Sequence, residues 1–429
     1  MTLAPSKETD FWRPSLSQIV DIMKDMSRHT DPQEMVRSYG AKIGELLPID
    51  RRISLSRRGL EAPLFRITRS STWKSEINPW HEKSRLPLLD GGLLSRLIYS
   101  DEPSIIDDLE IDPADPAAEY FEGHQSLAAI PMYDQGVALN MVVLLRKERA
   151  AFPPEEFPQM VWITNLFGRA TNNLVLSDDL QRANVALDRE MKAVGEIQRS
   201  LLPDRMPKIA TLDLAAYYQP SRRAGGDYYD FFPLPDGKWG IFIADVSGHG
   251  TPAAVLMAVT HCIAHTNPGA LQPPAQVLDY INRHLTNLYT GSNGSFVTAF
   301  YGVYDPVNRT LRYACAGHPP PRLKRCQDGS LLELDCAGGY PLGVMDDGEY
   351  DEAMQTLQSG DQIVFYTDGI TEAANPRGEL FGAERLDRVL ENCSVQASSL
   401  LDSVLASMDE FAEGRPADDD RTMIVARVM

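Results

Sequence analysis

The chain has 429 residues, 43% of them hydrophobic and 24% charged, and its formal net charge at pH 7 is −19. This length predicts two or three domains, and the composition is typical of a globular protein. The acidic balance argues against a nucleic-acid partner, because nucleic-acid phosphates would repel it. No apolar run approaches the roughly 20 residues of a membrane-spanning helix, and the N-terminal residues lack the apolar core of a secretion signal. We therefore expect a cytoplasmic protein without a membrane partner.

The five cysteines all follow residue 260 and form no Cys-x-x-Cys pair. An odd number without metal-site spacing predicts reduced structural thiols, as expected in a reducing compartment. They are Cys262, Cys315, Cys326, Cys336 and Cys393.

The first third of the chain predicts a mixed α/β domain. Apolar residues recur three or four positions apart over residues 16–47 and predict two amphipathic helices, the second opened by Asp31 as N-cap and Pro32 as first residue. Short alternating segments follow, of which residues 126–132 and 138–145 predict paired strands. Residues 152–176 return to helical periodicity. This order over residues 14–172 resembles a GAF domain, and the resemblance implies an unknown ligand or protein partner there. Another α/β sensory domain, such as a PAS-like one, is the alternative.

The helical pattern continues through residues 173–203 as a short a/d seam, with one polar interruption. This seam predicts a coiled-coil signalling linker and a homodimer. The alternative is a helix that packs its apolar stripe on the domain that follows in the same chain. The seam consists of Leu176, Leu180, Ala183, Leu187, Glu190, Val194, Ile197 and Leu201.

Residues 204–429 are rich in β-prone runs. Six of them predict strands, at 214–218, 239–244, 296–303, 311–316, 362–366 and 422–428. Helices are predicted at 251–265, with Thr251 as its cap, at 274–288 and at 397–411. Many antiparallel connections with helices in pairs imply a β-sandwich covered by helices on both outer faces. The predicted fold class is therefore α/β in the broad sense (α+β), with an α-β-β-α sandwich at its C-terminal end.

Four short acidic segments, at residues 225–230, 244–250, 366–372 and 418–422, are the most informative feature of this half. In three of them an Asp stands beside Gly or ends an apolar run, where a strand delivers a carboxylate to a sheet edge. Gathered carboxylates suit hard cations such as Mg²⁺, Mn²⁺ or Ca²⁺, whereas zinc or copper would require Cys or His in matching number.

These segments belong to a series of motifs. They read ADVSGHG at 244–250, AGHPP at 316–320, PLG at 341–343, YTDG at 366–369 and DDRT at 419–422, with EIQRSLLP at 196–203 and AGGDYYD at 224–230 upstream. In this order they resemble the metal-dependent (PPM, protein phosphatase 2C-like) serine/threonine phosphatases of the bacterial SpoIIE/RsbU type. The resemblance covers residues 195–429.

The resemblance implies a site for two or three divalent cations, Mn²⁺ or Mg²⁺, that activate a water to attack a phosphoserine or phosphothreonine in line. Carried over by motif, Asp245 would bridge two ions and the carbonyl of Val246 would complete one coordination sphere. Asp368 and Asp419 would hold the other ion. Asp227 would stand on the opposite side.

Several neighbouring residues receive weaker assignments. The spacing to Thr422 favours Asp419 over Asp420 as the ligand, which leaves Asp420 and Asp230 as partners of the ligands. Arg222 could contact phosphate or belong to a solvated basic pair with its neighbour Arg223.

The helix that carries Gln198 would be a regulatory switch. His249 is a candidate general acid, although a local hydrogen-bonding role is favoured inside its turn.

Two other motifs have competing interpretations. The Gly-Gly-Asp segment at 225–227 is similar to the signature of diguanylate cyclases, but Tyr228 replaces the second acidic residue and the α/β repeat is absent. His261 and His265 have the i,i+4 spacing of a zinc pair, yet no Glu follows His261 and no third ligand is evident. Core or surface histidines are the favoured interpretation.

The resembled subfamily implies a phosphorylated STAS-type anti-sigma factor antagonist as protein substrate, and control by the N-terminal sensor through the linker helix. The competing hypothesis is a catalytically silent module that binds a phosphoprotein. The presence of all four expected carboxylates argues against it, because a silent relative would more often have lost one.

Overall fold

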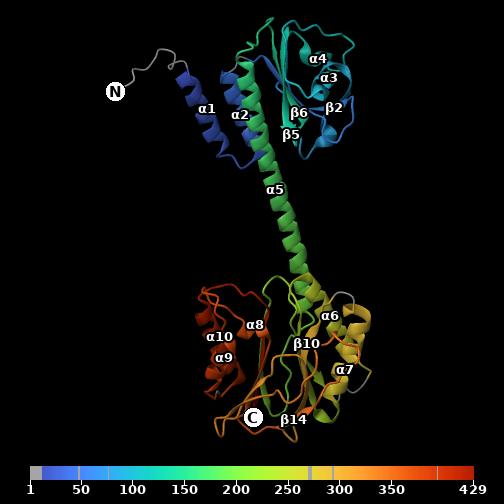
Figure 1. The fold of residues 1–429 in the computed structure, drawn as a ribbon, viewed down its shortest axis with the longest axis vertical. Coiled ribbons are helices and arrows are strands. Elements are labelled where there is room, and N and C mark those ends of the chain that lie inside the picture. The colour runs from blue at the N-terminus through green and yellow to red at the C-terminus, as the bar shows by residue number, and fades with distance from the viewer. Residues whose placement is uncertain (1–11, 47–48, 76, 269–272, 292–293, 394) are drawn as a thin grey trace, which may run out of the picture. The chain divides into compact units, whose positions relative to one another are not determined.

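The computed structural model describes residues 12–46, 49–75, 77–268, 273–291, 294–393 and 395–429. The chain divides into two compact units, Met1–Asn184 and Val185–Met429. Both contain sheets and helices (Figure 1), which confirms the mixed α/β class. Within the described parts of the chain, no helix combines the length and apolarity that a membrane crossing requires.

The first unit is built on one six-stranded sheet in which every neighbouring pair is antiparallel. In spatial order its strands are β3 (Leu88–Asp90), β2 (Leu64–Ser70), β1 (Arg51–Ser56), β6 (Val137–Arg146), β5 (Ser126–Asp134) and β4 (Ser104–Ile106). The two strands predicted at 126–132 and 138–145 are therefore confirmed as the β5–β6 hairpin.

Helices cover both faces of this sheet. One face buries α3 (Gly92–Ser100) and α4 (Ala118–Phe121) in an apolar cluster, and the other packs on the start of α5 (Phe157–Arg199). A short 3-10 turn, Lys83–Arg85, precedes β3.

The predicted helix pair is present as α1 (Trp12–Met26) and α2 (Pro32–Leu46), while Leu47, its last predicted residue, lies outside the described residues. Asp31 caps α2 as expected, since its Oδ1 accepts the Glu34 amide at 2.8 Å. On α2, Tyr39 stacks on Phe167 of α5 with ring centroids 3.7 Å apart.

The second unit contains two five-stranded antiparallel sheets. The first has the order β14 (Ala353–Thr356), β11 (Thr310–Ala316), β10 (Val297–Asp305), β9 (Trp239–Val246) and β8 (Tyr228–Pro233). The second has the order β13 (Leu331–Glu333), β12 (Arg322–Lys324), β15 (Gln362–Tyr366), β16 (Arg421–Val428) and β7 (Leu212–Gln219).

The sheets pack on each other through alternate side chains. Ile363 and Phe365 of β15 point into the core between the sheets, where Phe365 meets Phe300 of β10 at 5.5 Å between ring centroids. Val364 and Tyr366 face the opposite way, into a separate cluster with α9 and α10. This period of two is the alternation on which the strand predictions were based.

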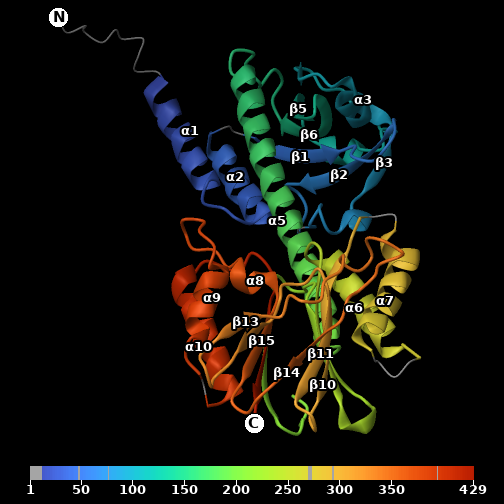
Figure 2. The same ribbon diagram turned by 60° about the horizontal axis from the view of Figure 1, so that its bottom comes forward.

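Four main helices complete the layers (Figure 2). Helices α6 (Thr251–His265) and α7 (Pro274–Leu285) cover the first sheet, and α9 (Gly382–Leu390) and α10 (Ala397–Ala412) cover the second. The predicted α-β-β-α layering is confirmed for this unit. A one-turn helix, α8 (Asp368–Thr371), follows β15, and a 3-10 turn at Pro235–Gly237 joins β8 to β9.

Some predicted boundaries were wrong. Gly250 is the N-cap of α6 and Thr251 its first residue, and α7 ends at Leu285 before a π-turn, Thr286–Thr290. Strand β8 was missed because its residues, Tyr-Tyr-Asp-Phe-Phe-Pro, are nearly all buried and show no alternation.

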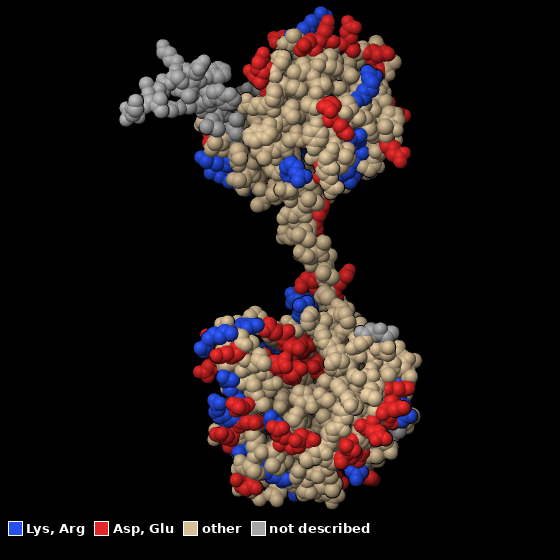
Figure 3. Space-filling model, in the orientation of Figure 1, with Lys and Arg blue, Asp and Glu red and all other residues tan. Residues whose placement is uncertain are grey.

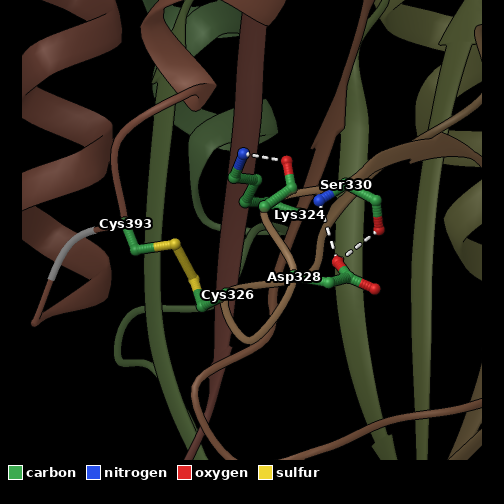
Figure 4. The surroundings of a disulfide bond; sticks show 6 residues. Lys324, Cys326, Asp328, Ser330 and Cys393 are labelled. Atoms are coloured by element: carbon green, nitrogen blue, oxygen red, sulfur yellow. Dashed lines mark hydrogen bonds between the residues drawn. A yellow bond between two sulfur atoms is a disulfide. The ribbon is translucent and has the colours of Figure 1, made fainter.

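The prediction that all five cysteines are reduced was wrong for two of them. Cys326 and Cys393 form a disulfide (Figure 4), while Cys262, Cys315 and Cys336 are free. The bond joins the loop between β12 and β13 to the segment between α9 and α10. Lys324, the last residue of β12, donates its Nζ to the carbonyl of Gly329 in this loop at 2.6 Å. A sequence separation of 67 residues hides such a pair from any argument based on spacing.

Candidate functional site

Four aspartates from the acidic segments meet at the ends of strands of the second unit. Asp227 directly precedes β8 and Asp245 lies near the end of β9, the neighbouring strand of the first sheet. Asp368 opens α8 just after β15, and Asp419 stands two residues before β16, the neighbour of β15 in the second sheet. Each sheet therefore contributes two carboxylates to one cluster.

The cluster is electrostatically strained in the absence of cations. Burial, and then the charges of Asp227, Asp368 and Asp419, raise the pKa of Asp245 strongly. The buried carboxyl of Asp227, within hydrogen-bonding reach of Asp245, has its pKa raised mainly by burial. Burial and the charge of Asp419 raise the pKa of Asp368 to about 6, and burial raises that of Asp419. Hydrogen bonds lower these pKa values only in part, and a nearby positive charge would further stabilise the carboxylates as anions.

Two buried threonines fix the orientation of Asp227. Thr367 Oγ1 donates to Asp227 Oδ2 at 2.8 Å, and Thr422 Oγ1 donates to the same oxygen at 2.5 Å. Both hydroxyls are fully buried. These bonds link the Asp227 segment of the first sheet to the ends of β15 and β16 in the second. Both threonines lie in motifs that the sequence showed, but no role was predicted for either.

Asp420 holds the loop before Asp227, and its charge also helps to raise the pKa of Asp227, Asp368 and Asp419. Its Oδ1 accepts the Ser221 amide at 2.7 Å, and its Oδ2 accepts the Gly226 amide. The side chain is 2% exposed, and its backbone amide donates to Asp419 Oδ1 at 2.8 Å. Of the adjacent acidic residues, Asp419 is thus the one whose carboxylate interacts with Asp245.

Close backbone approaches explain two glycines of the motifs. A Cβ atom on Gly226 would lie 2.8 Å from the carbonyl oxygen of Val246, and one on Gly369 would collide with the Asp420 carbonyl. Only glycine permits such contacts. The Val246 carbonyl therefore lies beside the loop that delivers Asp227.

The remaining predicted residues lie around this cluster or apart from it. Arg222 is exposed, and Arg223 forms an ion pair with Asp188 of α5, with Nε and Oδ1 2.8 Å apart. His249 is exposed and interacts electrostatically with Asp419. Asp230 faces His261 and His265 of α6.

The acidic character extends to the surface. Figure 3 shows a dense group of acidic side chains around the place that α8 has in Figure 1. Glu372, at the end of α8, is exposed and its charge contributes to the raised pKa of Asp368. A cation approaching this face therefore meets an attractive potential.

Comparison with known proteins shows the family to which this chain belongs. The family model of stage II sporulation protein E (SpoIIE) matches residues 235–429. The phosphoserine phosphatase RsbU of Bacillus subtilis (strain 168) is 31% identical over 238 residues, which cover 56% of this chain and 70% of RsbU. The chain belongs to the SpoIIE/RsbU family of PPM serine/threonine phosphatases.

Two further similarities agree with this membership. The phosphoserine phosphatase RsbP of the same organism is 24% identical over 250 residues, covering 58% of this chain and 60% of RsbP. The solved SiaA-PP2C domain of Pseudomonas aeruginosa aligns with a TM-score of 0.52 at 22% identity, covering 58% of this chain and 99% of that domain. The second comparison shows the fold of the sandwich unit.

Phosphatases of the PPM family depend on divalent metal ions, and the donor set observed here fits such ions. The cluster offers carboxylate oxygens, which Mg²⁺ and Mn²⁺ accept as ligands, and the Val246 carbonyl lies beside Gly226 in the loop that leads to Asp227. Burial, and then mutual repulsion, raise the pKa of Asp245 and Asp368, so a bound cation would offset the cost of their ionised forms.

The electrostatics predict that removing one carboxylate stabilises the metal-free protein. In the folded state the pKa of Asp368 is about 6, above its usual 3.8. Ionisation of Asp368 therefore lowers the free energy of unfolding. This loss grows between about pH 4 and 6 and reaches its full value above that range. At pH 8 in chelator, Asp368→Asn should raise Tm by about 2–4 °C, and the gain should vanish near pH 4.

Thermal unfolding in chelator and in saturating Mn²⁺ checks this prediction. Mn²⁺ should stabilise the unsubstituted protein more than Asp368→Asn. The exposed Asp402→Asn on α10 is the matched control and should leave Tm unchanged at both pH values. A lower Tm for Asp368→Asn in chelator at pH 8 would contradict the electrostatic argument.

Proposed function

We propose that this chain is a Mn²⁺- or Mg²⁺-dependent protein phosphatase that hydrolyses phosphoserine or phosphothreonine on a regulatory protein. The observation that carries the proposal is the convergence of Asp227, Asp245, Asp368 and Asp419, from four separate segments, in one cluster with raised pKa values. When bound, two ions would activate a water nucleophile and neutralise charge on the phosphoryl oxygens.

Different residues of the cluster would hold different ions. Asp245 interacts with all three other carboxylates and is suited to bridge. Asp368 and Asp419 would hold one ion, and the Val246 carbonyl would complete the sphere of the other. Asp227, oriented by its two threonines, would act on the opposite side. A third ion would have to bind to carboxylates that do not bridge the first two ions.

The histidine of the AGHPP motif has a structural place in this proposal. His318 is 4% exposed, its Nδ1 lies 2.9 Å from Thr298 Oγ1, and burial lowers its pKa to about 3. The neutral ring therefore supports β10 and does not supply a positive charge to a phosphate group.

For the substrate we propose a phosphorylated STAS-type anti-sigma factor antagonist, on the strength of family membership. Relatives with the names RsbU and RsbP are phosphoserine phosphatases. The acidic surface around α8 would disfavour an acidic phosphopeptide, so recognition of a folded partner would have to supply binding energy away from the carboxylates.

Phosphate release tests the site. With Mn²⁺ and a phosphoserine substrate, Asp245→Asn and Asp419→Asn should each lower kcat by about 100- to 1,000-fold or more, because each removes a ligand of the ions whose positive charge would stabilise the transition state. The exposed neighbour Asp418, which pairs with Arg415 at 2.7 Å, supplies the matched control, and Asp418→Asn should retain activity. Full activity of Asp419→Asn, or none in the unsubstituted protein, would refute the assignment and favour a silent binding module.

We further propose three functional regions: a GAF-like sensor at residues 14–172, a linker and switch helix at 173–203, and the phosphatase domain at 204–429. The antiparallel sheet with helices on both faces supports a sensory module of this kind.

The C-terminal end of α5 supports the switch. Gln198 is 3% exposed, its Oε1 accepts the Gly225 amide at 2.9 Å, and its Nε2 donates to the Gly225 carbonyl. One amide side chain thus satisfies both backbone groups of a residue two positions before Asp227. A shift of α5 along its axis would break both bonds and release the loop that positions this ligand.

Three other contacts bring the same face of α5 onto the phosphatase unit. They are the Asp188–Arg223 ion pair, the contact of Met191 Sδ with Thr251 Oγ1 at 3.2 Å, and Gly195, whose missing Cβ makes room for the Arg223 carbonyl. The spacing of Asp188, Met191, Gly195 and Gln198 is that of one helix face. This face touches both the segment before Asp227 and the start of α6.

Loss of the Gln198 amide should weaken metal binding more than it slows the saturated enzyme. Gln198→Ala is expected to raise the Mn²⁺ concentration for half-maximal activity about tenfold, as removal of partners that orient metal ligands usually does. Glu196→Ala, exposed on the same turn, is the control and should behave as the unsubstituted protein. An unchanged Mn²⁺ dependence of Gln198→Ala would contradict the switch.

We also propose a homodimer formed through the linker seam. Its apolar side chains are exposed in the single chain: Leu176 by 59%, Leu180 by 63%, Leu187 by 57% and Ile197 by 67%. Each seam position from Leu187 to Ile197 directly precedes one of the four residues that contact the phosphatase unit, so the stripe lies on the neighbouring face of the helix. A second copy of the same seam would cover this stripe by coiled-coil packing.

Static light scattering tests the dimer. The intact protein should show twice the 47.7 kDa of one chain, and Leu180→Glu with Leu187→Glu should convert it to monomer, because charges at a and d positions are not tolerated. Gln181→Glu with Asn184→Glu, exposed positions outside the seam, should remain dimeric. A monomer at high micromolar concentration would exclude this interface.

A further inference from the structure

The two histidines that lacked a third partner in the sequence acquire one in the structure. His261 and His265 lie on α6, and the carboxylate of Asp230, from β8, faces both rings. One ligand atom from each of these three residues lies within 4.8 Å of the other two. Asp230 precedes the histidine pair by 31 positions in the chain, and the pairing of β8 under α6 brings it there.

The individual distances fit a single ion after small side-chain adjustments. His265 Nε2 lies 2.7 Å from Asp230 Oδ2, and His261 Nδ1 lies 3.9 Å from the same oxygen. Ligand atoms around a tetrahedral zinc ion at its usual bond lengths are about 3.3 Å apart. The two observed distances bracket this value, and the ring centroids of the histidines are 4.2 Å apart.

The carboxylate is oriented from outside the group, as metal ligands usually are. Tyr228 Oη donates to Asp230 Oδ2 at 2.7 Å, and the Phe231 amide donates to Asp230 Oδ1 at 2.7 Å. Phe232 packs beside His265 with ring centroids 5.0 Å apart. Asp230 is therefore 8% exposed and held in place, while the His265 side chain is 44% exposed and leaves a path for an ion.

The protonation state also suits a ligand. Burial, and then the neighbouring His265, lower the pKa of His261. The imidazole is thus neutral near pH 7 and offers a lone pair to a metal.

We propose that Asp230, His261 and His265 form a binding site for one divalent transition-metal ion of the zinc type, separate from the carboxylate cluster. Two imidazoles and one carboxylate are a ligand set for zinc that leaves a fourth position for water. The ion would tie the C-terminal half of α6 to β8. This strand begins next to Asp227, and α6 begins directly after the Asp245 motif.

Zn²⁺ titration of the metal-free full-length protein against a chromophoric chelator tests the site. The double variant Asp368→Asn with Asp419→Asn removes competition from the carboxylate cluster, and we expect it to bind one Zn²⁺ per chain. Adding His265→Ala to this variant should weaken binding at least about tenfold. The His265 side chain is 44% exposed, and circular dichroism would verify that its removal leaves the fold intact.

Two matched controls exclude other sources of binding. His284→Ala removes a histidine from the neighbouring helix α7, and Cys262→Ser removes the exposed thiol beside His261; both should retain the Zn²⁺ ion. Co²⁺ gives an independent readout, since the visible absorption of four-coordinate Co²⁺ should appear with the site and disappear with His265→Ala. Absence of Zn²⁺ binding in the carboxylate variant, or binding unchanged by both His261→Ala and His265→Ala, would overturn the proposal and leave the three residues as a hydrogen-bonded cluster.

Discussion

The mutual repulsion of four aspartates is the constraint on which the phosphatase unit depends. Two sheets deliver two carboxylates each, so the sandwich must hold together a cluster whose members oppose one another. Buried threonine hydroxyls and the Asp420 carboxylate lock the loops in place. The repulsion favours cation binding, because a bound cation would offset the free-energy cost of holding ionised carboxylates close together.

The loop before Asp227 is the point at which the proposed switch would act. Its backbone is held from one side by Asp420 and from the other by Gln198 of α5. The first contact belongs to the phosphatase fold, whereas the second belongs to a helix that also contributes residues to the N-terminal unit. In the proposed switch, a small displacement of that helix would move the loop that carries Asp227 without unfolding the sandwich, and a two-state device of this kind would couple distant events to catalysis.

Helix α6 connects this centre to the proposed transition-metal site. It starts beside the Asp245 motif and ends with His265 against Asp230 of β8. The ligand sets differ in kind, since the first centre offers only oxygen and the second offers two imidazoles. Hard ions such as Mg²⁺ would therefore prefer the carboxylate centre, and borderline ions such as Zn²⁺ would prefer the site with two imidazoles.

The sequence by itself determined the family, the layered fold of the C-terminal half and the four aspartates, because motif order and period-two alternation are local properties of the chain. It did not reveal strand β8, the disulfide between Cys326 and Cys393, the threonines that orient Asp227, or Asp230 as a partner of two histidines. Strand β8 pairs with β9, which follows it closely, and gave no signal because its side chains are nearly all buried. The other three features depend on contacts between segments far apart in the chain. Only the tertiary structure brings such segments together, since their contacts arise from sheet packing and leave no periodic signal in either segment.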